Sequence, residues 1–126
     1  MRCDPRAFLF DIQEAIEAIH AAVEGVNLAQ YQQSRLIRSA VEREFILIGE
    51  ALVCLSRLDP ELFARIEEAP QVIAFRNRLT HEYVAIDNRL VWGVIQSFSG
   101  PLLSTCKQLL DELDPSPDRL QDEGSY

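Results

Sequence analysis

Long apolar runs are missing from this sequence of 126 residues. The longest one, at 45–55, is interrupted by Gly49 and Glu50 and is too short to span a bilayer. Residues 1–5 include an acid and a proline, where a secretory segment requires apolar residues. These absences predict a soluble protein of the cytoplasm.

Cysteine and histidine are scarce, with three and two residues respectively. An odd number of cysteines without a CxxC spacing argues against a disulfide framework and against a zinc site. Cys54 and Cys106 fall on helical apolar stripes, where we expect them to be buried. The sequence also lacks an HExxH, a GxSxG, a GxGxxG and a Walker motif. We therefore expect neither a metal nor a cofactor.

Positive charge is in short supply, because 12 basic residues face 20 acidic ones and the formal net charge is −8. This balance disfavours a protein that holds long nucleic acids through a broad basic surface. Lys107 is the only lysine, and the other basic side chains are arginines, which make paired contacts with phosphate or carboxylate groups. The composition is compatible with a local phosphate site.

Apolar residues recur at steps of three and four along most of the chain, which is the period of amphipathic helices. Asp–Pro pairs mark helix starts, and Gly100–Pro101 marks a kink. The pattern predicts an all-α antiparallel helical bundle with four main helices, a short one and a kinked last helix. The expected helices are 5–24, 34–58, 60–68, 71–83 and 87–113, with a connector at 27–33 for which a short helical turn is the alternative. Residues 1–113 form the expected domain, and 114–126 a disordered tail.

The helix expected at 34–58 carries two apolar stripes. Ile37, Val41, Phe45, Ile48, Leu52 and Leu55 form the first, and Leu36, Ala40, Leu47, Ala51, Cys54 and Leu58 the second. One stripe is sufficient for a surface helix, so two predict burial on more than one side. In so small a domain, the second stripe indicates self-association.

The segment at 75–83, FRNRLTHEY, concentrates the side chains suited to chemistry. Taken alone, it is also compatible with a purely structural role. In that interpretation His81 offsets the dipole at the end of a helix, while Arg76 and Arg78 pair with acids on neighbouring helices.

The spacing in this segment is specific. Four residues separate Arg76 from His81, Asn77 follows the arginine, and one residue separates His81 from Tyr83. This pattern resembles the Arg–X4–His–X–Tyr signature of HepT-like toxins in the HEPN superfamily. A second segment, AVEREFILIGEA at 40–51, is similar to the second-helix segment of that family, which commonly ends in Gly-Glu-Ala.

The resemblance implies an endoribonuclease that cleaves RNA without a metal, through attack of a ribose 2′-hydroxyl on the adjacent phosphate. His81 would then be the general acid or base, because an imidazole exchanges protons near neutral pH. Arg76 would bind the phosphate oxygens. Asn77, one helical turn before His81, would orient the imidazole or the phosphate. Ile46 departs from the family, in which many relatives carry an acid at that position.

The resemblance also implies partners and a modification. In HepT-like systems the tyrosine, here Tyr83, accepts AMP groups from a cognate minimal nucleotidyltransferase that acts as the antitoxin. Added anions beside the site would block it by bulk and by charge. Glu50 and Arg78 are supporting candidates. Glu50 is a possible ion-pair partner of Arg76, and a solvated position or another ion pair is the alternative.

On an unbroken helix, Arg76 and His81 point about 140° apart, because each residue advances by about 100°. Either the helix loosens near His81, or two protomers contribute residues to one cleft. HEPN toxins resemble the second case, so we expect a homodimer. Two other function classes stay open. One is a non-catalytic HEPN module that binds a nucleotide or a protein, which the negative charge favours, and the other is a helical interaction protein.

Overall fold

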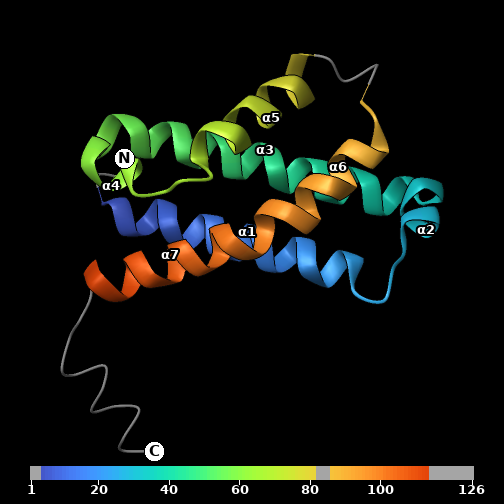
Figure 1. The fold of residues 1–126 in the computed structure, drawn as a ribbon, viewed down its shortest axis with the longest axis horizontal. Coiled ribbons are helices and arrows are strands. Elements are labelled where there is room, and N and C mark those ends of the chain that lie inside the picture. Colours follow the sequence, from blue (N-terminus) through green and yellow to red (C-terminus); the bar gives the residue numbers. More distant parts are fainter. Residues whose placement is uncertain (1–3, 82–85, 114–126) are drawn as a thin grey trace, which may run out of the picture.

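A computed structural model of the chain describes residues 4–81 and 86–113, and every regular element within these ranges is a helix (Figure 1). The prediction of an all-α helical bundle is confirmed. Tyr83 and the expected tail at 114–126 lie outside the described residues. None of the described helices is both long enough and apolar enough to cross a membrane.

The helix boundaries agree closely with the sequence pattern. The elements are α1 (Pro5–Val23), α2 (Leu28–Gln33), α3 (Arg35–Leu58), α4 (Pro60–Ala64), α5 (Ala69–His81), α6 (Asn88–Val94), the π-helix η2 (Ile95–Ser99) and α7 (Gly100–Leu113). The expected connector at 27–33 contains a helix, α2, which begins with a capping box formed by Asn27 and Gln30. The short helix α4 ends earlier than expected, and α5 begins two residues earlier.

Short polar side chains fix the helix starts. Asp4 caps α1, Ser34 caps α3, Asp59 caps α4 and Asp87 caps α6, each accepting a hydrogen bond from a backbone N–H of the first turn. Such a cap typically contributes about 1 kcal/mol. The Asp–Pro pairs therefore begin helices where the sequence places them.

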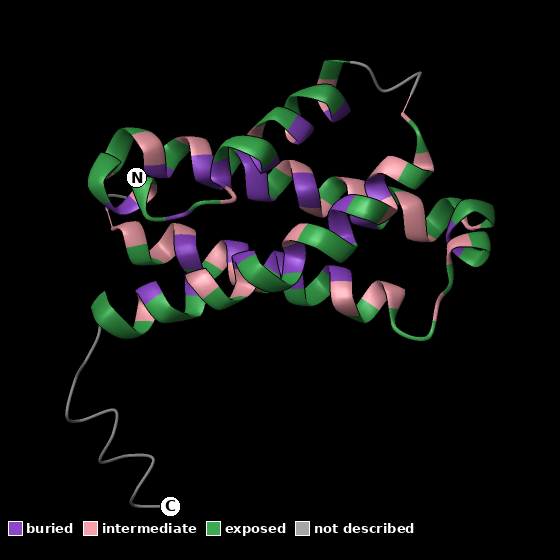
Figure 2. Ribbon diagram, in the orientation of Figure 1, coloured by how far each residue is buried: buried purple, intermediate pink, exposed green. Residues whose placement is uncertain are grey.

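The long helix α3 lies at the centre of the bundle, with α1 and α5 packed against it and α7 packed against α1. These neighbours run antiparallel (Figure 1), and their facing sides carry the buried residues (Figure 2). Phe45 of α3 and Phe75 of α5 meet edge to face, with ring centroids 5.1 Å apart. Their contact holds α5 against the centre of α3, which positions the motif segment.

The last helical segment is continuous from Asn88 to Leu113 but is not a uniform α-helix. A π-turn, η2, precedes Gly100–Pro101, and the chain bends between α6 and α7 (Figure 1). Proline has no N–H, and its ring crowds the carbonyl four residues earlier, so a wider turn relieves the contact. The predicted kink is therefore present, but it begins before the Gly–Pro pair. Within the π-turn Ser99 is buried, and Phe98 is partly buried against the core.

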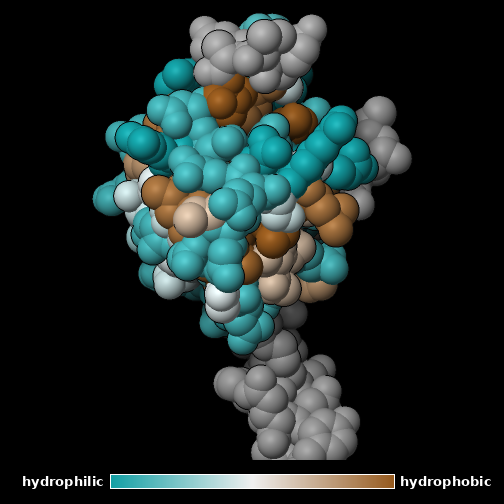
Figure 3. All heavy atoms as spheres, turned by 90° about the vertical axis from the view of Figure 1, so that its right-hand side faces the viewer, coloured by the Kyte–Doolittle hydropathy of each residue, from teal (hydrophilic) through white to brown (hydrophobic). Residues whose placement is uncertain are grey.

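The two stripes of α3 have different environments. The first is buried, except that Ile37 is only partly so. In the second, Ala51 is buried, whereas Leu36 is 82% exposed and Leu47 and Leu58 are about two-fifths exposed. The expectation that Cys54 is buried was wrong, because Cys54 lines an open groove between α1 and α3; Cys106 is buried as expected. The end of the bundle near α2 is mostly hydrophilic, with separate hydrophobic patches (Figure 3).

Candidate functional site

Arg76 is held at the contact between α5 and α3. Its side chain is only 25% exposed, and its stem lies against the backbone of Gly49 in α3. The Nη1 group donates a hydrogen bond of 2.9 Å to Oδ1 of Asn77, and Nη2 lies 3.6 Å from Oε1 of Glu50. The contact with α3 and the hydrogen bond to Asn77 thus fix one guanidinium at the surface.

The Glu50 carboxylate is the ion-pair partner that the sequence left open. The distance between its Oε1 atom and Nη2 of Arg76 is longer than a hydrogen bond, and the Glu50 side chain is 52% exposed. A pair of this kind contributes only about 0–1 kcal/mol to stability. Since the carboxylate holds the cation weakly, a phosphate that approaches Arg76 can replace it.

His81 does not join this cluster. The helix α5 stays α-helical through His81, so the loosened helix considered above is not observed. His81 and Arg76 therefore leave the helix about 140° apart. His81 is exposed and makes no hydrogen bond or ion pair with another described residue. Asn77 uses its amide oxygen for Arg76, and the Thr80 hydroxyl donates to the carbonyl oxygens of both residues.

Two candidates, Arg78 and Tyr83, are not part of the Arg76 cluster as the structure describes it. Arg78 is exposed on the same helix. Tyr83, the expected acceptor of AMP groups, lies outside the described residues. Among residues 4–81 and 86–113, no group of three or more His, Cys, Asp or Glu side chains is arranged to hold a metal ion.

Sequence reasoning missed a hydrogen-bonded pair at the π-turn. Nε2 of His20 lies 2.8 Å from the hydroxyl of Ser99, which is 2.5 Å from the carbonyl oxygen of Ile95. The hydroxyl has one proton and donates it to Ile95, so His20 is the donor in the other contact. Because His20 donates, it cannot act as a base toward the Ser99 hydroxyl. The hydrogen-bonded pair stabilises the π-turn. No sequence signal links two residues 79 positions apart.

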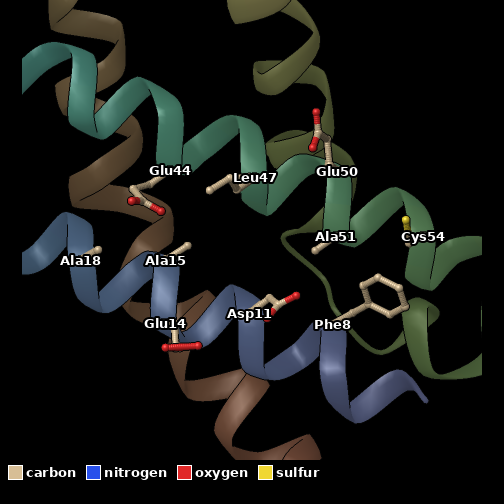
Figure 4. A pocket seen from close by; sticks show the side chains of 10 residues that line it. All are labelled: Phe8, Asp11, Glu14, Ala15, Ala18, Glu44, Leu47, Glu50, Ala51 and Cys54. Carbon is tan, nitrogen blue, oxygen red and sulfur yellow. The ribbon is translucent and has the colours of Figure 1, made fainter. Parts of the chain in front are cut away.

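A groove between α1 and α3 lies beside the Arg76 cluster (Figure 4). Its lining includes four acidic residues and no basic one: Asp11, Glu14, Glu44 and Glu50. A phosphate would be repelled here, so the lining of this groove does not fit a phosphate group. The Glu50 carboxylate itself points away from α1 in Figure 4, consistent with its contact to Arg76.

A second polar cluster lies where α2 and α3 meet. Tyr31 is fully buried, and its hydroxyl has no hydrogen-bond partner among the described residues. Burial raises the pKa of this hydroxyl, and Glu42 adds to the effect while Arg38 opposes it. Burial also raises the pKa of Glu42, against the influence of Arg38. Arg38 lies about 16 Å along α3 from Gly49, whereas Glu42 lines one pocket with Glu50, the ion-pair partner of Arg76.

Comparison with known proteins adds independent information. The family model described as "Ribonuclease HepT-like" matches residues 12–109. A Methanocaldococcus jannaschii protein named as a "putative RNase" is 29% identical over 93 residues, which are 74% of this chain and 84% of the relative. A second protein of that organism, also named as a "putative RNase", is 31% identical over 97 residues, 73% of this chain and 75% of the relative.

A Thermococcus cleftensis protein named as a "probable ribonuclease HepT" is 29% identical over 99 residues, 76% of this chain and 86% of the relative. No solved structure matches the chain significantly. The family match includes all of α3 and α5, and with them Gly49, Glu50, Arg76, Asn77 and His81. The chain therefore belongs to the HepT-like ribonuclease family of the HEPN superfamily.

Proposed function

We propose that this protein is the toxin of a toxin–antitoxin system, an endoribonuclease that cleaves RNA in the cytoplasm without a metal ion. The observation that carries the proposal is the fixed guanidinium of Arg76, seated between α3 and α5 and held by Asn77. It lies in a chain whose relatives are named as ribonucleases. A preorganised cation at the surface is the group that a negatively charged transition state requires.

In the proposed reaction, the ribose 2′-oxygen attacks the adjacent phosphorus, and the bond from phosphorus to the 5′-oxygen breaks. A base removes the proton of the 2′-hydroxyl, and an acid protonates the leaving 5′-oxygen. The products are a 2′,3′-cyclic phosphate and a 5′-hydroxyl end. His81 serves as acid or base, and Arg76 binds the phosphate oxygens. Asn77 holds the guanidinium, a role supported by its 2.9 Å hydrogen bond.

The active form in this proposal is a homodimer, with Arg76 from one protomer beside His81 from the other. Two observations support it. The regular helix α5 separates the two side chains within one protomer. The exposed residues Leu36, Leu47 and Leu58 of α3 fall within about 40° of one another around the helix. These side chains supply apolar surface for a two-fold contact.

The proposed antitoxin is a minimal nucleotidyltransferase that transfers AMP to Tyr83. The attached phosphates would lie two residues from His81 and would compete with RNA for the arginines of α5. Co-expression with a nucleotidyltransferase encoded beside this chain should add AMP mass to the peptide containing Tyr83. Tyr83→Phe should remain unmodified. AMP on another residue in the wild-type chain would contradict this part of the proposal.

The decisive test of the activity uses purified protein, RNA and excess EDTA. We expect cleavage that leaves 2′,3′-cyclic phosphate ends. His81→Ala should abolish cleavage and leave the thermal melt nearly unchanged, because the imidazole is exposed. The matched control is His20→Ala, the other histidine, which should still cleave. Binding of RNA without any cleavage would instead favour a non-catalytic module.

A further inference from the structure

The helix α5 approaches α3 closely at a glycine. A Cβ atom added to Gly49 would lie far inside van der Waals contact with Cβ and Cγ of Arg76, and 3.1 Å from its Cδ. By contrast, a Cβ atom at Gly93 or Gly100 would meet nothing within 4 Å. Glycine is among the poorest residues for a helix interior, so a glycine in the middle of α3 needs a packing reason. The stem of Arg76 supplies that reason.

This contact determines where the guanidinium lies. The stem of Arg76 rests on the backbone of α3, and its Nε atom is buried with no hydrogen-bond partner among the described residues. The neighbouring Glu50 reaches Nη2 only at 3.6 Å and is half exposed. Asn77, on the same helix as Arg76, moves with it and cannot fix α5 relative to α3. The contact with Gly49 therefore sets where the stem of Arg76 lies on α3, beside the Phe45–Phe75 contact that holds the two helices together.

We propose that Gly49 is a positioning residue for Arg76. The missing side chain lets α5 approach α3 closely enough to seat the guanidinium beside Glu50. Any side chain at position 49 pushes the stem of Arg76 outward and displaces its phosphate-binding end. This inference rests on the proposed function, because it assigns Gly49 a role in the same nuclease site.

The test compares Gly49→Ala with Gly93→Ala, which makes the same change in a helix where nothing lies near the new methyl group. Displacing a catalytic group by about 1 Å costs about 100-fold in rate, so we expect kcat/KM for RNA cleavage to fall about 10- to 100-fold in Gly49→Ala. Gly93→Ala should stay within about twofold of wild type, since alanine suits a helix better than glycine. A folded Gly49→Ala variant that cleaves like wild type would overturn the proposal.

A second readout does not depend on cleavage. The NMR resonance of the Arg76 Nε–Hε group should shift in Gly49→Ala and stay in place in Gly93→Ala. If the wild-type protein does not cleave RNA, the nuclease proposal fails, and this resonance alone decides the positioning role. An unchanged resonance in Gly49→Ala would overturn it.

A third variant covers the case in which Gly49→Ala does not fold. Arg76→Gly removes all three side-chain atoms that the new Cβ would meet. The double variant Gly49→Ala/Arg76→Gly should then fold, with a melting temperature at or above that of Arg76→Gly alone. If Arg76→Gly folds and the double variant does not, the obstacle is not Arg76, which would contradict the inference.

Discussion

Replacement of Arg76 by lysine tests the phosphate-binding role without removing the positive charge. The guanidinium uses Nη1 for Asn77 and places Nη2 near Glu50, while its planar shape allows paired hydrogen bonds to a phosphate. A lysine ammonium is a single point of charge and cannot keep the Asn77 contact while presenting two parallel donors. Arg76→Lys should therefore lose at least one charge-assisted hydrogen bond to the transition state.

The expected loss follows from the strength of that bond. A hydrogen bond to a charged group contributes about 1.5–3 kcal/mol. At about 1.4 kcal/mol per tenfold change in rate, kcat/KM should fall about 10- to 150-fold. Stability should change little, because the lysine methylenes can still cover Gly49 and the ion pair with half-exposed Glu50 is weak.

The assay is cleavage of a short RNA under single-turnover conditions, together with a urea unfolding curve. Arg65→Lys is the matched control, because Arg65 pairs with Glu112 of α7, away from the motif segment. It should cleave at the wild-type rate. Full activity in Arg76→Lys would refute the argument that the planar guanidinium, and not charge alone, serves the reaction.

Three further predictions concern the bundle. Phe45→Ala should lower the free energy of unfolding by about 3–5 kcal/mol in urea titration, since its buried ring leaves a cavity, and a loss below about 1 kcal/mol would contradict the packing. Burial raises the pKa of Cys106 to about 12, so peptide mapping after maleimide treatment should find exposed Cys54 labelled and Cys106 unlabelled. Burial raises the pKa of Glu42 more than Arg38 lowers it, so folded protein binds more protons than unfolded protein between the two pKa values. Stability therefore falls as pH rises through that window, and Glu42→Gln should be more stable than wild type at neutral pH, with the difference vanishing at acid pH. An equal difference at both pH values would contradict this.

Local features of the fold could be predicted from the sequence because their causes lie within a few residues. Asp4, Ser34 and Asp59 each cap a helix start, and the apolar stripe of α3 identifies its buried side. The π-turn could not be predicted in the same way. It depends on Pro101, two residues after Ser99, and on a hydrogen bond from His20, a residue of another helix.

In the candidate site, too, features with local causes could be predicted and features that depend on helix packing could not. The motif spacing identified Arg76, Asn77 and His81 as candidates, and their roles stay proposals. The seat of Arg76 on Gly49 and its distance to Glu50 depend on how α5 packs against α3, which sequence periodicity does not specify. In the sequence the glycine stood out as an interruption of an apolar run and as part of the Gly-Glu-Ala ending of the second-helix segment, and the role proposed for it comes from the approach of two helices.

The central claim, that one protomer supplies Arg76 and the other His81, is tested most directly by mixing two inactive variants. Arg76→Ala and His81→Ala should each fail to cleave RNA. After subunit exchange, half of the dimers pair one of each, and each such dimer regains one intact site of two. The account therefore predicts about one quarter of wild-type activity in the equimolar mixture. A mixture that exchanges subunits and stays inactive would contradict it.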